Sequence, residues 1–223
     1  AHPDYPALAV KHLAEITGID FHNSEDLIAA TSDCGAYVAL SSACKSLAVK
    51  LTKVCNDLRL LASGPRTGLS ELVLPQLQPG SSIMPGKVNP VIPEVTNQAS
   101  FLAIGLDQTV MLAASAGQLE LNVMEPVISF ALYLQMKVLT NACIAMREKC
   151  VDGIVVNADH TKDLVMGSLG IITLLKPHFG YKPCAAIARE GFLTGKSLHE
   201  LLVEEKKMIT QEQWDEIFTY ENL

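Results

Sequence analysis

Apolar residues recur along the chain at spacings of three and four, which is the pattern of α-helices. The longest run repeats every seven residues: Tyr37, Leu40, Cys44, Leu47, Leu51, Val54, Leu58 and Leu61. Such a repeat is typical of the seam between helices packed at a shallow left-handed angle. We predict a helix that is capped at Asn23 or Ser24 and stops at Gly64–Pro65, roughly 60 Å long.

Two further helical runs follow the first one. One begins near Pro93, a favoured first residue of a helix, and the other extends from about Met124 to Cys150. No segment shows the alternation of apolar and polar residues that a half-buried strand would have. The pattern therefore predicts an all-α fold built on a bundle of long helices.

The composition changes after Gly153, where shorter helical segments appear between glycines. Ser197 to Glu200 and Thr210 to Gln213 both have the spacing of a capping box. We therefore expect two domains: a helical-bundle segment over residues 1–155 and a small helical C-terminal domain over residues 156–223.

The composition is apolar for a water-soluble chain. Of 223 residues, 49% are hydrophobic and 18% are charged, and the mean hydropathy is +0.25. One chain has difficulty covering such a long apolar helix, so we expect a homo-oligomer formed through the long helices. No run of about 18 uninterrupted apolar residues and no secretory leader is found, so no membrane partner is expected. The net charge of −7 argues against a nucleic-acid partner.

The cysteines and histidines indicate no metal site. Six cysteines form no C-x-x-C pair, and six histidines form no H-x-x-x-H pair. We expect reduced, buried thiols in a cytoplasmic protein that needs no metal and no cofactor. Cys44 and Cys55 are interpreted as core residues rather than nucleophiles, and the scattered histidines as structural ones: His160, His178 and His199.

Between the first two long helices lies a segment, Gly64 to Ile92, with little regular structure predicted. Loops this long are uncommon in compact proteins and are usually functional or disordered. It contains GSSIMPGKVNP (80–90). A bound carboxylate could receive serine hydroxyls, backbone N–H groups, the Lys87 ammonium and the positive end of a helix capped by Asn89. A Ser/Gly/Pro cluster before a helix is nevertheless most often only a loop with a cap.

GSSIMPGKVNP resembles the G-S-S-x-x-P-x-K-x-N signature of the aspartase/fumarase superfamily at every fixed position. The resemblance covers essentially the whole chain, as the second half of a family subunit. GQLELNVMEPV (117–127) is similar to the family's next helix junction, and KPHFGY (176–181) is similar to its C-terminal domain. NPVIPEV (89–95) and NVMEPV (122–127) are more similar to the aspartate ammonia-lyase branch than to fumarase.

The resemblance implies a carbon–nitrogen lyase that reversibly converts L-aspartate to fumarate and ammonia. Ser81 would be the general base, taking a proton from the carbon beside one carboxylate and leaving an aci-carboxylate. Ser82 would bind the carboxylate that takes up the charge. The other end of the substrate would be bound by Lys87, the backbone at Val88 and Asn89. Gly80 and Glu94 would support the site, Glu94 as an ion-pair partner of Lys87.

In the family each active site takes loops from three subunits of a homotetramer. Counterparts of the family's N-terminal loops and histidine are not found in this sequence, so the resemblance implies that this chain alone is inactive. Two alternatives stay open at this point. One is a fumarase, which hydrates fumarate to malate. The other is a non-catalytic helical assembly module that keeps the loop as inherited structure.

Overall fold

A computed structural model describes residues 2–80, 83–84, 86–219 and 221–222. It confirms the all-α fold, since the only strands among the described residues are two of two residues each. The chain forms two compact units. The first unit contains residues 1–62 and 74–154, and the second contains residues 63–73 and 155–223.

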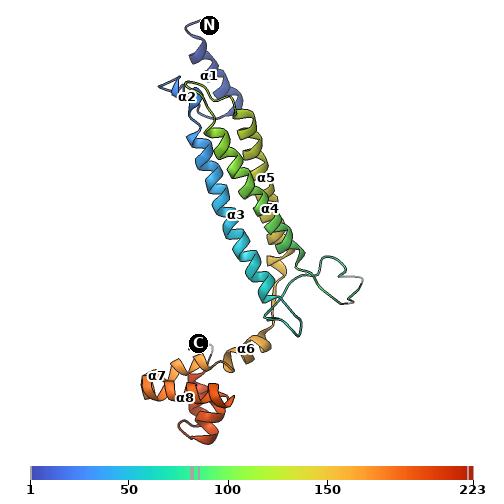
Figure 1. Cartoon of the computed structure of the whole chain (residues 1–223), viewed down its shortest axis with the longest axis vertical. Helices are drawn as coiled ribbons and strands as arrows, with labels where there is room; N and C mark the ends of the chain where they lie inside the picture. Colours follow the sequence, from blue (N-terminus) through green and yellow to red (C-terminus); the bar gives the residue numbers. More distant parts are fainter. Residues whose placement is uncertain (1, 81–82, 85, 220, 223) are drawn as a thin grey trace. The chain divides into compact units, whose positions relative to one another are not determined.

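Three long helices form the bundle of the first unit and pack side by side (Figure 1). They are α3 (Gly35–Leu61), α4 (Val91–Ala114) and α5 (Glu125–Lys149). The predicted starts of α4 and α5 are correct to within two residues. The smaller elements of this unit are α1 (Tyr5–Thr17), α2 (Ala29–Ser32) and the 3₁₀-helix η1 (Val151–Gly153).

The predicted start of the first long helix is wrong, because α3 begins at Gly35 rather than at residue 23 or 24. Two aspartates make local turns in between. Asp26 Oδ1 accepts the N–H of Ala29 at 3.0 Å, and Asp33 Oδ1 accepts the N–H of Gly35 at 2.9 Å. Short polar side chains that bind nearby N–H groups compete in this way with a continuous helix.

Only part of the seven-residue apolar repeat of α3 lies on the face that packs inside the bundle. Cys44 and Leu51 pack against a cluster with Ala103 and Leu139, and Leu58 packs against the cluster around Cys55. That face carries small residues, and Ser41, Ala48 and Cys55 are fully buried. Small residues allow the helix axes to approach closely, so larger side chains are not needed there. Four other residues of the repeat keep 42–50% of their surface exposed: Tyr37, Leu40, Leu47 and Val54.

The bundle helices expose further large apolar side chains, among them Phe101, Leu112, Phe130 and Tyr133 at 57–64%. We expect the chain to sediment as a dimer or larger species at micromolar concentration, because an apolar surface of this kind is rarely left in water. Phe130→Asp should weaken that assembly, whereas Phe192→Asp on the second unit should leave it unchanged. A well-folded monomer in sedimentation velocity would contradict the prediction.

A polar layer crosses the bundle and was not anticipated from the sequence. Asp107 is buried, and its carboxylate accepts a hydrogen bond from Ser41 Oγ at 2.8 Å and one from Lys45 Nζ at 2.5 Å. Gln135 Nε2 donates to the carbonyl oxygens of Ser41 and Ala103. Burial alone would raise the pKa of Asp107, but the hydrogen bonds from Lys45, Ser41 and Ser42 and the positive charge of Lys45 together hold this pKa below its ordinary value.

By length and composition, the stretch from Glu125 to Gly153 is the one candidate membrane span among the described residues. Its helix α5 contacts both α3 and α4. Residues along its inner face are buried, including the amide of Gln135. An apolar helix at the centre of a bundle has the same length and composition as a span, so these properties do not identify one.

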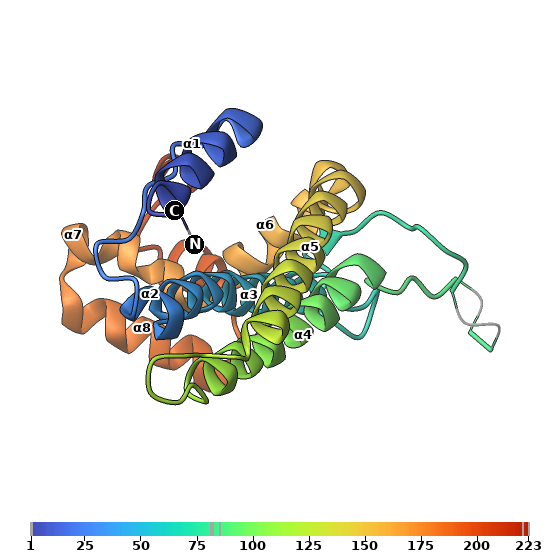
Figure 2. The same ribbon diagram turned by 90° about the horizontal axis from the view of Figure 1, so that it is seen from above.

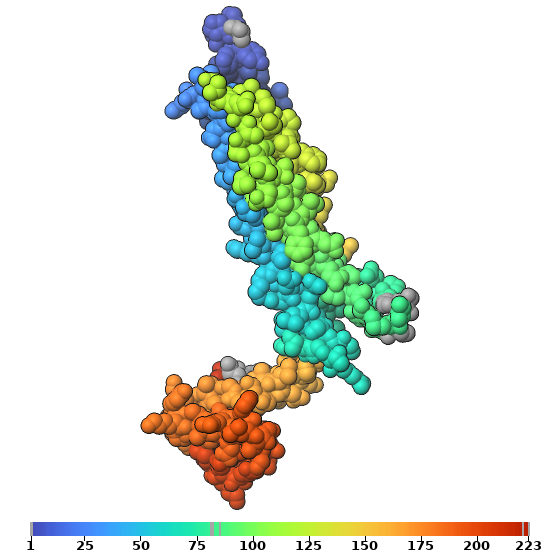
Figure 3. Space-filling model, viewed as in Figure 1, coloured from blue at the N-terminus to red at the C-terminus, as the bar shows by residue number. Residues whose placement is uncertain are grey.

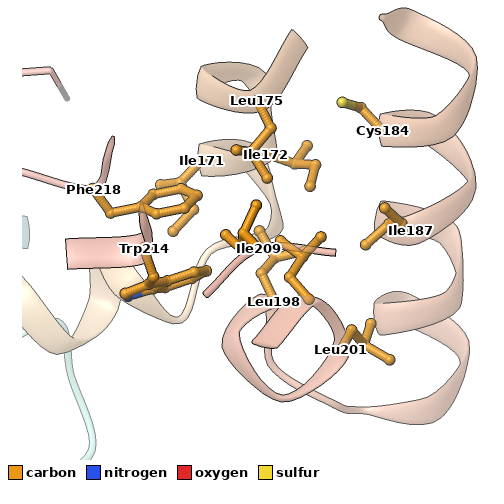
Figure 4. Packing of buried hydrophobic residues seen from close by; sticks show 11 residues of the cluster. Ile171, Ile172, Leu175, Cys184, Ile187, Leu198, Leu201, Ile209, Trp214 and Phe218 are labelled. Atoms are coloured by element: carbon orange, nitrogen blue, oxygen red, sulfur yellow. The ribbon is translucent and has the colours of Figure 1, made fainter. Parts of the chain in front are cut away.

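The second unit packs short helices around one apolar core (Figure 4). Its elements are α6 (Ala158–Met166), the 3₁₀-helix η2 (Leu169–Leu175), α7 (Lys176–Phe179), α8 (Tyr181–Thr194), the π-helix η3 (Glu200–Glu205) and α9 (Gln211–Ile217). The capping box at Thr210–Gln213 is confirmed. The hydrogen bonds between Ser197 and Glu200 also form, but a π-helix rather than an α-helix follows.

Residues 63–73 belong to the second unit because they pair with residues 155–157, at the start of the unit's C-terminal segment. β1 (Leu72–Val73) and β2 (Val155–Val156) form an antiparallel pair. Asn157 continues the contact, with its N–H donating to Glu71 O at 3.0 Å. His160 Nε2 lies 2.8 Å from the carbonyl oxygen of Leu69, so this histidine has a structural partner.

Candidate functional site

The segment that contains GSSIMPGKVNP is anchored at both ends on one apolar cluster. Leu74, just before it, is buried together with Cys55 and Cys150, and Ile92 at the start of α4 packs against the same cluster. The chain between these anchors leaves the helices and returns (Figure 2). In the space-filling view, the described atoms of this part protrude from the side of the bundle (Figure 3).

The thiols of this cluster are core groups, in agreement with the interpretation of Cys55 from the sequence. Burial, with a smaller contribution from Cys150, raises the pKa of Cys55 to about 11. Burial also raises the pKa of Cys150. A thiol with such a pKa is protonated at neutral pH and is a poor nucleophile. All six cysteines are unpaired.

The backbone around Lys87 has a local hydrogen bond and a glycine with a positive φ. The N–H of Lys87 donates to Met84 O at 3.2 Å. Gly86 has φ +82°, in the left-handed region of backbone conformation. A glycine adopts this conformation without steric cost.

Gly80 lies directly against the backbone of Lys87. A Cβ atom at position 80 would be 1.8 Å from the carbonyl oxygen of Lys87 and 2.7 Å from its carbonyl carbon. No side chain fits at such a distance, so only glycine is compatible with this contact. The backbones of Gly80 and Lys87 therefore lie in close contact at the two ends of this stretch.

The helix after the segment is not capped by Asn89, so that prediction is wrong. α4 begins at Val91, and its N-cap position is Pro90, which makes no side-chain hydrogen bond. Asn89 contributes only its carbonyl oxygen, which accepts the N–H of Val91 at 2.9 Å. The amide side chain of Asn89 is therefore not committed to a cap.

The residues implied by the resemblance fall into two groups. Ser81 and Ser82 lie outside the described residues. Lys87 is exposed, Val88 keeps 46% of its surface exposed, and Asn89 is half-buried. These three residues are consecutive in the chain and are separated from α4 only by Pro90.

Glu94 lies in the first turn of α4 and is half-buried. In the part of the chain that the structure describes, Glu94 and Lys87 form no ion pair with each other, so their pairing in a complete site stays a prediction. The same part contains no cluster of three His, Cys, Asp or Glu side chains able to hold a metal ion. What the described segment can offer a ligand is one ammonium group, one amide and nearby backbone groups, a set suited to a carboxylate.

Comparisons with known proteins agree with the sequence patterns. The family model "Lyase" matches residues 1–105, and the model "Fumarase C C-terminus" matches residues 171–223. An aspartate ammonia-lyase of Helicobacter pylori is 52% identical over 223 residues, which are 100% of this chain and 47% of that protein. One of Escherichia coli is 53% identical over 220 residues, 99% of this chain and 46% of that protein.

Solved structures show the same likeness. A fumarate lyase of Brucella melitensis superposes with a TM-score of 0.88 at 43% identity, over 92% of this chain and 45% of that one. A class II fumarase of Schistosoma mansoni superposes with a TM-score of 0.87 at 33% identity, over 98% of this chain and 49% of that one. The chain spans about half the length of the relatives it matches. From end to end of its sequence, it belongs to the aspartase/fumarase superfamily.

Proposed function

We propose that this chain is the C-terminal half of an aspartate ammonia-lyase subunit and carries one loop of the enzyme's active site. The enzyme would reversibly convert L-aspartate to fumarate and ammonia. The observation that carries the proposal is the identity of 52% with an aspartate ammonia-lyase over the whole chain. The complete signature in residues 80–89 supports it.

The proposed chemistry begins with Ser81 as an alkoxide. It takes a proton from the carbon beside one carboxylate, and the electron pair moves into that carboxylate to give an aci-carboxylate. The pair then returns to form the double bond, the C–N bond of the next carbon breaks, and ammonia leaves. Donors that bind the developing charge contribute most to the rate, and Ser82 is the candidate among this chain's residues.

Lys87, the backbone at Val88 and Asn89 are proposed to bind the other end of the substrate. Two observations support this assignment. Lys87 is exposed, while its N–H donates to Met84 O and its carbonyl oxygen lies against Gly80. The side chain of Asn89 makes no cap to α4. Glu94, one turn into the helix, is proposed to orient the Lys87 ammonium once substrate is bound.

Fumarase is the second candidate, since the C-terminal residues match the model "Fumarase C C-terminus" and the class II fumarase superposes over nearly the whole chain. The two activities share the carbanion chemistry and differ in the group that leaves, ammonia or water. Parallel assays with L-aspartate and L-malate separate them, because both release fumarate, which absorbs in the ultraviolet. Turnover of neither substrate by the complete protein would favour a non-catalytic assembly module.

We expect the chain by itself not to turn over L-aspartate. In the proposed tetramer each site is completed by loops from other subunits and from the other half of the subunit, and loss of groups that act together removes most of the rate. Mixing the chain with a matching N-terminal half should restore fumarate formation. Turnover by the chain alone, in a preparation free of host aspartase, would refute the expectation.

A further inference from the structure

The backbone of Lys87 has a close neighbour on each side of its α-carbon. Its N–H donates to Met84 O at 3.2 Å. Its carbonyl oxygen lies where a Cβ atom of residue 80 would come within 1.8 Å. These contacts constrain the position from which the Lys87 side chain starts, although the side chain itself is exposed.

We propose that Gly80 is a positioning residue for the Lys87 ammonium. Because Gly80 has no Cβ atom, its backbone can lie against the carbonyl group of Lys87, and this contact sets the position from which the Lys87 side chain extends. The inference rests on the proposed function, in which Lys87 binds the substrate. Gly80 touches no substrate in this scheme and acts only through Lys87.

The requirement for glycine at position 80 is one of space rather than of backbone conformation. Contacts of a Cβ atom below 3.0 Å essentially do not occur, so an alanine here must push the Lys87 carbonyl away by about 1 Å. Gly86 is the opposite case, since its φ is +82° and a Cβ atom there would meet nothing within 4 Å. The two glycines therefore form a matched pair for substitution.

The expected effect of Gly80→Ala is large because the displaced group binds substrate. A misplacement of about 1 Å in a positioning group can lower the rate about 10²-fold. In the complete enzyme, Gly80→Ala should lower kcat/KM by about 10–100-fold, chiefly through a higher KM. Gly86→Asn adds a larger side chain to the same loop but should cost less, because asparagine tolerates the left-handed conformation.

A double-mutant cycle tests whether Gly80 acts through Lys87. Kinetics are measured for the parent, Gly80→Ala, Lys87→Ala and the double variant. If Gly80 positions Lys87, adding Gly80→Ala to Lys87→Ala should change kcat/KM less than about threefold. If the two effects instead multiply, Gly80 supports the loop in some other way and the proposal is overturned.

A second measurement needs no enzymatic activity and uses the chain alone. A lysine-specific protease should cut after Lys87 faster in Gly80→Ala than in the parent, because the base of the loop no longer closes. Circular dichroism should show the same helix content in both. Equal cleavage rates in Gly80→Ala, Gly86→Asn and the parent would overturn the proposal. If the complete protein turns over neither L-aspartate nor L-malate, the proposed function fails, and the cleavage rates still decide whether Gly80 fixes Lys87.

Discussion

Replacing Ser81 with alanine should lower kcat of the complete enzyme by about 10⁴-fold or more and leave KM within a few-fold of the parent. Loss of a general base typically costs about 10²–10⁴-fold. We expect the upper end because the proposed alkoxide is held in a preorganised site. The carboxylate-binding groups stay in place, so binding of the ground state changes little. Steady-state kinetics of fumarate formation from L-aspartate measure both constants.

Lys87→Ala is the control that distinguishes a general base from a binding residue. Lys87 is proposed to bind ground state and transition state alike, so its loss should raise KM as well as lower kcat. If Ser81→Ala instead mainly raised KM and kept kcat within a few-fold, Ser81 would be a binding residue. The base would then be sought in Ser82 or in the other half of the subunit.

Replacing Lys45 with methionine should lower the free energy of unfolding by about 3 kcal/mol. This variant leaves the Asp107 carboxylate buried without its cation, and breaking a buried pair on one side typically costs about 3–5 kcal/mol. We expect the lower end because the Lys45 side chain is 36% exposed and water can partly reach the site. Urea unfolding at one fixed protein concentration measures the loss, since assembly makes stability depend on concentration.

Lys53→Met is the matched control on the same helix. Lys53 pairs with Asp57 one turn away, but both side chains are largely exposed, at 72% and 48%. Exposed pairs of this kind contribute at most about 0.5 kcal/mol. An equal loss in both variants would show that the polar layer has no special role.

The pH dependence gives an independent check on the polar layer. The folded-state pKa of Asp107 is below its ordinary value. Its contribution in the parent is therefore present above the unfolded-state pKa, about 3.9, and is lost as the pH falls through the lower folded-state value. The deficit of Lys45→Met should accordingly shrink as the pH falls, and it should vanish only below the folded-state pKa of Asp107 in the parent, where the carboxyl group is protonated in both folded proteins. A deficit that stays constant with pH would contradict this origin.

Helix boundaries were predicted well where a short sequence motif indicates only a helix start. Proline near the start of α4 and the Thr210–Gln213 capping box are such signals, and both elements occur as expected. The start of α3 failed because Ser, Asn and Asp cap helices and also form short turns, and only the three-dimensional fold distinguishes the two. The predicted seam of α3 is correct only in part, since Cys44, Leu51 and Leu58 pack inside the bundle while Tyr37, Leu40, Leu47 and Val54 stay exposed. Large apolar residues are expected to mark the buried face of the helix. The fully buried residues of α3 are instead small ones, Ser41, Ala48 and Cys55.

The candidate site was found by its signature, since Gly, Ser, Lys and Asn stand at fixed spacing in residues 80–89. Spacing cannot reveal that Gly80 meets the backbone of Lys87, because seven residues separate them and no periodic pattern links them. The anchoring of Leu74 and Ile92 on one cluster is likewise a long-range contact. Contacts of this kind depend on how the helices pack, which local pattern does not specify.

The chain crosses between its two compact units after Ala62, after Val73 and after Ile154. A single cut or a single gene fusion near residue 155 would therefore separate β2 from β1 and leave the carbonyl groups of residues 69–71 without their partners. Exchange of the C-terminal unit between related proteins would need three junctions rather than one. Chimeras that carry residues 63–73 together with 155–223 from the same parent should fold, whereas those that divide this pair should be prone to aggregation through an unpaired strand edge.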